Sequence, residues 1–265
     1  FKFEVLIHDD ASTDGTSKII QNYEERYPDI IKPLYEKENQ WIRGRYGFPA
    51  FTFPRSKGKY IALCEGDDFW TDPYKLQKQV DILEQKPGII AVVTNASVCD
   101  VAGKKLKNEK LVIPPDNMEG IYNLHDFFRK VNRYPTLTVT FCNRHMNLIT
   151  EQMNKLANPY LGDWILWVLL HMHGDFYFLN QVTAAYRINP DSLTHTVNPV
   201  KRWEADFIIR RELIQILPAE YHKYLNDDTY AYHMIGMSYR KQKKLCYLSF
   251  FKSEPFFAIH CFILR

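Results

Sequence analysis

Three carboxylates stand close together at Glu65, Asp67 and Asp68, directly after the apolar run Tyr60–Cys64. Such a run is typical of a strand covered on both faces, and ligands of open α/β sheets bind beyond the carboxyl ends of the strands. Clustered carboxylates repel one another unless a cation joins them. A Mg²⁺-type ion is held by one or two Asp side chains and completes its shell with substrate phosphates. The pattern therefore favours a metal-assisted phosphate site, with a solvated, capped turn as the alternative.

A second acidic strand end occurs nearer the start of the chain. Phe3–His8 has the composition of a buried strand, and Asp9 and Asp10 follow it directly. Further along, Arg43 and Arg45 are separated by one glycine and could face a diphosphate. Solvent-exposed arginines are commoner than ligands, so a surface position is the alternative for this pair.

Helices are predicted after both acidic segments, where they would hold the acidic residues in place. Thr16 or Ser17 is the expected cap of the first helix, which Pro28 would end. Asp72 is the expected cap of the second helix, with Pro73 in the first helical position. The apolar face of this second helix is expected to comprise Leu76, Val80 and Leu83.

Beyond the second helix, the regular alternation of strands and helices stops. A polar, proline-containing loop is expected at Lys104–Glu119, a helix capped by Asn123 follows, and another helix covers Trp164–Met172. His171 and His173 lie two residues apart, which splays them around a helix, so they are not expected to share a metal ion. Further strands are predicted at Ile31–Tyr35, Gly88–Thr94, Thr136–Phe141, Phe176–Leu179 and Val182–Ile188.

Composition limits the class of protein. The 265 residues are 46% hydrophobic, which is enough to bury a full core. The net charge of +3 is too small for a nucleic-acid binder, and no basic recognition motif occurs. Five single cysteines without metal or disulfide spacing indicate a reducing compartment. No signal peptide and no apolar run of roughly 20 residues is visible, so we expect a cytoplasmic protein, soluble or peripheral on the inner face of the membrane.

Four segments together resemble the family 2 glycosyltransferases, nucleotide-sugar-dependent enzymes that build bacterial surface polysaccharides. The segments are FEVLIHDDASTDGT, GKYIALCEGDDFWTDPYKLQKQ, LGDW and AYRINPDS, and the resemblance runs from Phe3 to about Ser192. It implies the GT-A fold, an α/β architecture with a Rossmann-like mixed sheet flanked by helices. The family normally begins with one further strand and helix that carry part of the nucleotide site, so an N-terminal truncation is expected.

The resemblance also implies roles for the acidic residues. Asp10 would accept a hydrogen bond from the base of the nucleotide, and Asp67 would touch its ribose. Asp68 would bind the divalent metal, Mn²⁺ or Mg²⁺, that bridges the diphosphate. Glu65 occupies the first acidic place of the family's DXD-like pattern, where Asp is usual. Arg45 is expected to contact the nucleotide sugar as well.

The pair Tyr186-Arg187 matches a second family motif, and Arg187 is expected to bind the nucleotide sugar. The family often has a histidine two residues after this arginine, placed to help the metal or the phosphates. Asn189 stands at that place here. Three alternatives follow: Asn189 supplies a carbonyl oxygen, His195 substitutes for the histidine, or water completes the metal shell.

Asp163 precedes the apolar helix, and by residue type alone it is an ordinary helix cap. The resemblance implies another role, because Gly162-Asp163-Trp164 matches the place where the family carries its acidic base. Direct displacement at the anomeric carbon requires the acceptor hydroxyl to lose its proton, and a carboxylate opposite the leaving diphosphate can take it. Asp163 is therefore expected to be the general base of an inverting transfer to a saccharide or lipid-linked acceptor.

The segment 199–265 lies outside the resemblance and is predicted to be a helical appendage of a glycosyltransferase domain over 1–198. Within that domain, 1–100 would bind the nucleotide sugar and 101–198 the acceptor. The basic run Arg240–Lys244 lies next to Leu248–Leu264, which contains five phenylalanines. This combination suits a helix lying on an anionic membrane surface. A helix packed on the core with a solvated basic face is the alternative.

Two other functions fit part of the pattern. A nucleotidyltransferase acting on sugar phosphates also uses a strand-end acidic pair and a divalent metal, but it typically shows a Gly-rich phosphate loop at its start. A non-catalytic module that binds nucleotides or carbohydrates is the second alternative. Release of sugar, release of pyrophosphate, or binding without turnover would distinguish the three.

Overall fold

A computed structural model of the chain describes residues 2–45, 47–111, 118–131, 133–156, 162–189 and 199–225, without the side chains of 107–111 and 199–204. The chain divides into two compact units, Phe1–Ser192 and Leu193–Arg265. His195 and the basic and aromatic segment 240–264 lie outside the described residues. No helix in the described ranges is long and apolar enough to cross a membrane.

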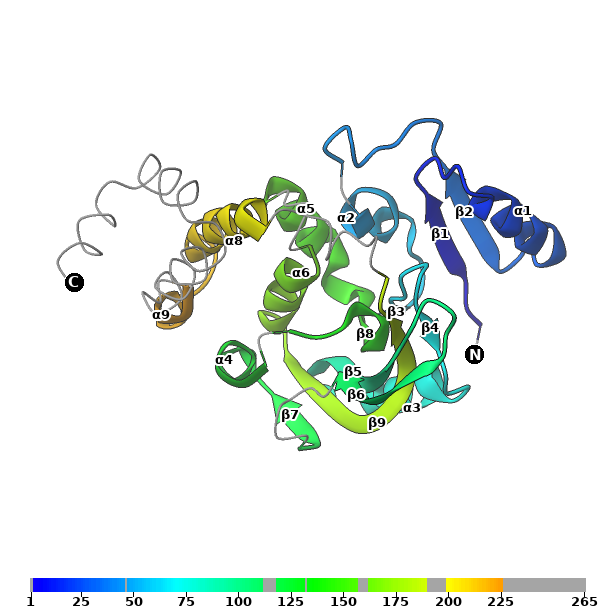
Figure 1. The fold of residues 1–265 in the computed structure, drawn as a ribbon. Helices are drawn as coiled ribbons and strands as arrows, with labels where there is room; N and C mark the ends of the chain where they lie inside the picture. Colours follow the sequence, from blue (N-terminus) through cyan, green and yellow to red (C-terminus); the bar gives the residue numbers. More distant parts are fainter. Residues whose placement is uncertain are drawn as a thin grey trace. The chain divides into compact units, whose positions relative to one another are not determined.

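The first unit begins with a two-stranded parallel sheet. Strand β1 (Val5–Asp9) pairs with β2 (Ile31–Tyr35), and helix α1 (Thr16–Arg26) makes the crossover between them (Figure 1). A parallel pair requires such a crossover, because the chain must return to the same end of the sheet. Asp10 therefore lies directly beyond the carboxyl end of β1, as the sequence predicts.

The second sheet has seven strands and mixed pairing. Its main order is β3-β8-β5-β9-β4, while β6 pairs with β5 and β7 pairs with β9. Strands β5 and β9 are parallel, and the other pairs of this sheet are antiparallel. The strands are β3 (Tyr60–Ala62), β4 (Phe69–Trp70), β5 (Ile89–Cys99), β6 (Lys105–Leu111), β7 (Gly120–Tyr122), β8 (Val139–Cys142) and β9 (Asp175–Arg187).

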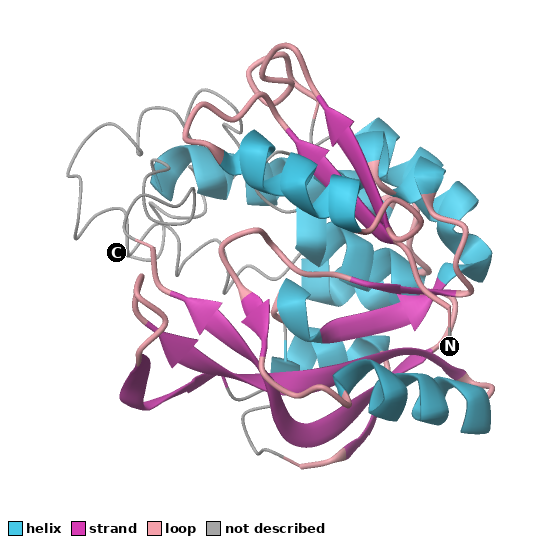
Figure 2. Cartoon of the chain, turned by 90° about the vertical axis from the view of Figure 1, so that its right-hand side faces the viewer, coloured by secondary structure: helices cyan, strands magenta, loops and turns pink. Residues whose placement is uncertain are grey.

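Strand β5 lies at the centre of the core. All eleven of its residues are buried, which fits a strand covered on both faces. Helices α3 (Lys75–Gln85) and α6 (Gly162–His171) both contact β5, and α5 (Met146–Leu156) packs on α6. Figure 2 shows helices on both sides of the large sheet. The expected α/β class, a mixed sheet flanked by helices, is confirmed.

Short helices fill several connections of the first unit. Helix α2 (Gly47–Phe51) and the 3₁₀ turn Phe53–Arg55 occupy the segment where prolines prevent a longer helix. The Asn123 side chain accepts from the third N–H of α4 (Leu124–Asp126), so this residue caps the helix as expected. One π-helical turn, Phe127–Val131, continues α4.

The second unit is helical in its described part. It contains α8 (Pro199–Ile214), the 3₁₀ turn Ala219–Tyr221 and α9 (His222–Leu225). A buried ion pair between Arg210 and Asp206, with a 3.0 Å distance from Nε to Oδ2, lies on α8. The helical character predicted for the segment after Pro199 is thus present in these residues.

The expected caps of α1 are wrong. Neither Thr16 nor Ser17 accepts a capping hydrogen bond, and the position before the helix is Gly15, whose φ of 92° is left-handed. The Thr16 hydroxyl instead donates to Asp14 at 2.6 Å. The Ser17 hydroxyl donates to Asp9, so this side chain holds the end of β1 instead of the helix start.

The expected start of α3 is also wrong. The helix begins at Lys75 instead of Pro73, and no side chain caps it. Asp72 accepts from the Tyr74 N–H at 2.8 Å and forms a turn before the helix. Local hydrogen bonding by Asp competes with helix formation in this way.

Several strand predictions differ from the structure. The two strands expected on either side of residue 180 are one strand, β9, and its register against β5 shifts beside residues 94–96. The exposed residues Asn180 and Gln181 suggest a turn in the sequence but lie within β9. Strand β6 lies in the segment expected to be a loop, and β8 begins only at Val139 because Thr136–Thr138 forms a 3₁₀ turn.

Candidate active site

The acidic loop Glu65–Asp68 lies between β3 and β4 of the large sheet. Because β3 pairs with β8 and β4 pairs with β9, the sheet holds the chain on both sides of this loop. Within the loop, the Asp68 N–H donates to the Glu65 carbonyl oxygen at 3.1 Å. Asp67 is exposed, whereas Glu65 and Asp68 are half-buried. The three carboxylates therefore differ in environment although they are close in sequence.

Arg187, at the end of β9, binds the acidic loop through two hydrogen bonds and the turn between β5 and β6 through a third. Its backbone N–H donates to Asp68 Oδ1 at 2.8 Å, and its Nε donates to the Asp67 carbonyl oxygen at 2.6 Å. Its Nη1 donates to the carbonyl oxygen of Val101, in the turn between β5 and β6, at 2.5 Å. Arg187 thus positions the loop by binding the Asp67 carbonyl oxygen and the Asp68 carboxylate, a role that the sequence did not indicate.

Burial changes the acidity of two loop carboxyls. It raises the pKa of Glu65 to about 7, against the opposing effect of a hydrogen bond from Thr136. It also raises the pKa of Asp68 to about 6, and the nearby Asp67 adds to this shift while the Arg187 N–H opposes it. A bound cation stabilises the ionised form of carboxyl groups that resist ionisation without it. Groups with strongly shifted pKa values are commonest at functional sites.

Asp163 lies in the first turn of α6, which begins at Gly162. Its Oδ1 accepts from the Trp164 N–H at 2.8 Å, and its carboxylate repels that of Glu65, whose pKa it helps to raise. This electrostatic repulsion links the helix start to the acidic loop across almost one hundred residues of sequence. The fold therefore brings the expected base and the expected metal-binding loop into one region.

The carboxylates of this region fit a divalent cation of the Mg²⁺ type. One buried oxygen, Glu65 Oε2, has no hydrogen-bond partner among the described residues. No three His, Cys, Asp or Glu side chains of the described ranges form a protein cage for a metal. A cage is not required, because Mg²⁺ is usually held by one or two carboxylates together with phosphate oxygens and water. Asn189 follows β9 and is half-buried.

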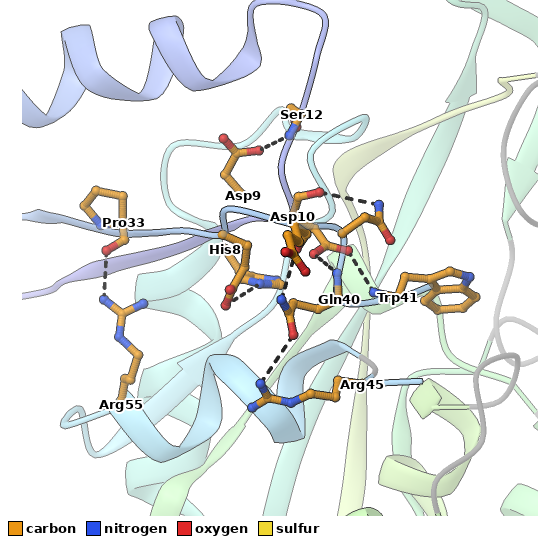
Figure 3. Close-up of polar contacts among 12 residues, drawn as sticks. His8, Asp9, Asp10, Ser12, Pro33, Gln40, Trp41, Arg45 and Arg55 are labelled. Atoms are coloured by element: carbon orange, nitrogen blue, oxygen red, sulfur yellow. Dashed lines mark hydrogen bonds and ion pairs between the residues drawn. The ribbon is translucent and has the colours of Figure 1, made fainter. Parts of the chain in front are cut away.

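Asp10 belongs to a second cluster, built on the two-stranded sheet (Figure 3). Its two carboxylate oxygens accept from the backbone N–H groups of Gln40 and Trp41 at 2.6 and 3.1 Å. Arg45 Nη1 donates to Gln40 Oε1 at 3.3 Å, and its guanidinium lies 4.7 Å from the centre of the Phe51 ring. Two expected nucleotide ligands, Asp10 and Arg45, are therefore brought together through Gln40.

Other polar residues near this cluster are already engaged. Arg43 forms an ion pair with Glu38, and both side chains are more than half exposed. Asp9 is buried and accepts from the Ser12 N–H at 3.2 Å (Figure 3). These contacts order the loops around Asp10 and leave Arg43 at the surface.

Comparison with known proteins identifies the family. The model of glycosyl transferase family 2 matches residues 1–156, which is more than half of the chain. The chain belongs to glycosyl transferase family 2. Both acidic strand ends lie within the matched segment, whereas Asp163 and Arg187 lie beyond it.

Several relatives of this family 2 chain are similar over most of its length. An uncharacterized protein of Mycobacterium tuberculosis is 45% identical over 206 residues, which cover 77% of this chain and 56% of that protein. TuaG of Bacillus subtilis, provisionally named a teichuronic acid biosynthesis glycosyltransferase, is 26% identical over 80% of this chain and 77% of its own. The chain spans about half the length of the mycobacterial relatives that it matches.

Two more distant similarities involve proteins with named substrates or ligands. The UDP-Glc:alpha-D-GlcNAc-diphosphoundecaprenol beta-1,3-glucosyltransferase WfaP of Escherichia coli is 32% identical over 31% of this chain and 30% of its own. A crystal structure of GalNAc-T7 with UDP, GalNAc and Mn²⁺ matches 91% of this chain and 52% of that chain, with a TM-score of 0.43 and 12% identity.

Two buried polar residues of this family 2 chain were not expected from the sequence. Lys75 and Gln79 on α3 are almost fully buried, although both looked like solvent-facing helix residues. Burial lowers the pKa of Lys75 to about 7. The only available signal was their spacing of four residues, which places them on the same helix face as Leu83.

Proposed function

We propose that the protein containing this chain transfers a sugar from a nucleoside diphosphate sugar to a saccharide or lipid-linked acceptor, with inversion and with the help of a divalent metal. The observation that carries the proposal is the convergence of Glu65, Asp68, Arg187 and Asp163 in one region of the fold. A donor diphosphate and a deprotonated acceptor require a cation site and a base close together, and this region offers candidates for both.

The donor side of the proposal uses both acidic strand ends. Asp10 and Arg45 would bind the nucleotide, with Asp10 accepting from the base while its backbone partners at 40 and 41 hold its carboxylate in place. Asp67, which is exposed, would accept from a ribose hydroxyl. Arg187 would complete the donor site from the other side of the loop, mainly by fixing the backbone of Asp67.

Asp68 would hold the divalent metal, Mn²⁺ or Mg²⁺, with Asn189, His195 or water as further ligands. When bound, such an ion neutralises the charge that develops on the leaving diphosphate. The support is chemical: half-burial and the neighbouring Asp67 carboxylate raise the Asp68 pKa, so a cation would remove an unfavourable interaction.

Asp163 would act as the base that accepts the proton of the acceptor hydroxyl. The acceptor oxygen forms a bond to the anomeric carbon, the bond from that carbon to the diphosphate breaks, and the electron pair leaves with the diphosphate. The proton moves to an Asp163 oxygen. Its place in the first turn of α6 favours the ionised form, because N–H groups and the helix dipole stabilise a negative charge there.

The names of two relatives support an acceptor in cell-surface polysaccharide synthesis. WfaP is named for transfer to a diphosphoundecaprenol-linked sugar, and TuaG is named for teichuronic acid biosynthesis. A lipid-linked acceptor would be presented at the membrane, so a cytoplasmic enzyme bound peripherally to the inner face fits this function. The free sugar chain of a growing polysaccharide is the other acceptor within the same proposal.

The test is a screen of the full-length protein with UDP-, GDP- and dTDP-sugars, by thermal shift with and without Mn²⁺, followed by product analysis. We expect one nucleotide class to raise the melting temperature only with the metal, and the nucleoside diphosphate to be released when an acceptor is supplied. Release of pyrophosphate would instead indicate a nucleotidyltransferase. Binding without any turnover on a broad acceptor panel would indicate a binding module.

A further inference from the structure

The inner face of α3 is polar at two of its three buried positions. Lys75 and Gln79 have relative exposures of 1% and 0%, and Leu83 completes the stripe at 5%. The residues expected to form this face, Leu76 and Val80, are only half-buried. Burying a lysine is costly unless its ammonium has partners, so the contacts of this stripe require an explanation.

Gln79 is fully engaged with the large sheet. Its Nε2 donates to the carbonyl oxygens of Val92 on β5 and Thr138 before β8, each at 2.8 Å. Its Oε1 accepts from the Thr140 hydroxyl at 2.8 Å and from Lys75 Nζ at 2.7 Å. The amide therefore fixes α3 against two strands and presents a fixed acceptor to Lys75.

Lys75 in turn contacts the strand that follows the acidic loop. Its Nζ lies 4.7 Å from the centre of the Trp70 ring, in the strand that follows the loop. On the other side of the loop, Lys75 and the Cys64 thiol each influence the pKa of the other, and Cys64 is the residue that precedes Glu65. The Trp70 ring is held a second time, because its Nε1 donates to the Leu137 carbonyl oxygen at 3.1 Å.

The neighbouring residue of β4 has a matching contact. The Arg187 guanidinium lies 5.4 Å from the centre of the Phe69 ring. Successive residues of a strand point to opposite faces, so a cation covers an aromatic ring on each face of β4 directly after Asp68. Arg187 supplies one cation from the end of β9, and Lys75 supplies the other from within the core.

We propose that Lys75 is a positioning residue that fixes the acidic loop for its metal and diphosphate ligands through Trp70 and Gln79. The inference rests on the proposed function, since it concerns the same loop. Lys75 itself does not contact the donor. Its hydrogen bond to Gln79 forms with either a charged or a neutral amine, whereas its cation–π contact with the Trp70 ring requires the charged form.

Substitution distinguishes a lysine that only stabilises the fold from a lysine that positions the loop. Replacing a buried charge with an apolar side chain of similar volume is often neutral or stabilising. Lys75→Met keeps an unbranched side chain in the space, and Gln79 Oε1 keeps its bond from Thr140. We therefore expect Lys75→Met not to lower the melting temperature, while loosening the loop at Trp70.

The experiment measures the affinity of the full-length protein for the nucleoside diphosphate, UDP, GDP or dTDP, that gives the largest thermal shift with Mn²⁺. Residues that orient metal ligands indirectly typically change metal affinity by roughly 10–100-fold, and we expect a loss of that size for Lys75→Met in calorimetric titration. At saturating donor and metal, kcat should change much less than KM for the donor. Trp70→Leu should weaken binding to a similar degree, and the double variant should be no weaker than the worse single variant.

Leu83→Ala is the matched control, because it opens a cavity two turns along the same face of α3. It should lower the melting temperature and leave the nucleotide affinity near the parental value. If the parental protein binds the nucleotide and both Lys75→Met and Trp70→Leu keep its affinity, the positioning role of Lys75 is overturned while the proposed function stands. An equal loss of affinity in Leu83→Ala would also overturn it, as general loosening of α3. Absence of metal-dependent binding by the parental protein would overturn the proposed function as well.

Discussion

Asp163 and Glu65 carry neighbouring carboxyl groups that the fold treats differently. Asp163 lies in the first turn of a helix, which favours its ionised form, whereas burial pushes the pKa of Glu65 upward to about 7. Near neutral pH, Glu65 therefore retains a proton for part of the time. Two carboxyls in such different environments are a common arrangement in sites that move protons.

Asp163→Asn should lower turnover by roughly 10²–10⁴-fold while donor affinity stays near the parental value, because only the proton acceptor is lost. A residue that merely stabilises the start of α6 would instead cost about 0.5–2 kcal/mol of stability and spare the chemistry. Steady-state kinetics, donor titration and melting temperature distinguish the two. Asp175→Asn, at another half-buried carboxyl outside the site, is the control and should retain full turnover. An Asp163→Asn variant that melts lower but transfers sugar normally would exclude the base.

Glu65→Gln should stabilise the metal-free protein at high pH. Because the folded-state pKa is raised above that of the unfolded chain, the folded protein binds more protons between about pH 4.5 and 7 and loses stability as pH rises through this window. The neutral amide avoids that loss. Melting temperatures in EDTA should coincide at pH 4.5 and favour the variant above pH 7.

Glu84→Gln provides the comparison for that measurement. Glu84 is exposed and pairs with Lys59, and the hydrogen bond from Lys59 lowers the pKa of Glu84. Removing the Glu84 carboxylate should therefore not raise the melting temperature at high pH. An equal gain in both variants would mean that net charge, and not the burial of Glu65, causes the effect.

The candidate site was predictable from sequence where residue type and strand position coincide. Asp10 and Asp68 follow short apolar runs, and that pattern alone placed them beyond strand ends. The pattern could not show that the Arg187 side chain donates to backbone carbonyl oxygens, or that Lys75 lies in the core. Both features depend on segments that are distant in sequence, and a charged side chain in a helix ordinarily indicates solvent.

Among the elements, α6 and the turn before β8 share an aromatic cluster with unpartnered polar atoms. Tyr134 is buried, and its hydroxyl has no hydrogen-bond partner within the described part of the chain. The same holds for both ring nitrogens of His171, whose ring stacks on Phe176 at 3.9 Å between centroids. Burial lowers the pKa of His171 to about 3, so the ring is neutral and packs as an aromatic residue.

Tyr134→Phe should stabilise the protein by about 1–3 kcal/mol, because the variant no longer buries an unsatisfied hydroxyl. Tyr122→Phe is the matched control: Tyr122 is also buried, but its hydroxyl donates to the Met118 carbonyl oxygen at 2.7 Å. Chemical denaturation should therefore show opposite signs for the two variants. Destabilisation by Tyr134→Phe would indicate a buried water that bridges the hydroxyl to a neighbour.

The type of each helix or strand was predictable from the sequence more often than the residues at which it begins and ends. Strand β5 was recognised from its apolar start, yet it continues to Cys99 through Asn95 and Ser97, which are polar and buried. Strand β9 was divided because Asn180 and Gln181 suggest a turn. In both cases, pairing along the sheet outweighs local preference, which sequence periodicity cannot reveal.

At the scale of the whole molecule, the proposed function draws on residues from two sheets and one helix start. The two-stranded sheet contributes Asp10, the large sheet contributes the acidic loop and Arg187, and α6 contributes Asp163. In the proposed function, nucleotide binding and acceptor activation would fall to separate segments. Variants of Asp10 and of Asp163 should therefore affect donor binding and turnover separately.

Removal of residues 245–265 should weaken binding to anionic vesicles and leave nucleotide binding intact, because this segment combines aromatic residues with a neighbouring basic run. Cosedimentation with phosphatidylglycerol vesicles, compared with phosphatidylcholine vesicles, measures the difference. Equal sedimentation of both proteins, or unfolding of the shortened one, would favour a segment packed on the protein.

The most direct test of the central claim is a calorimetric titration of the nucleotide sugar into the parental protein, Asp68→Asn and Asp163→Asn, each in Mn²⁺ and in EDTA. We predict tight binding only in Mn²⁺ for the parental protein, loss of that metal dependence in Asp68→Asn, and its retention in Asp163→Asn, because in the proposed function Asp68 would hold the metal and Asp163 would act on the acceptor. Parental affinity that is equal in Mn²⁺ and EDTA, and unchanged in Asp68→Asn, would contradict the account.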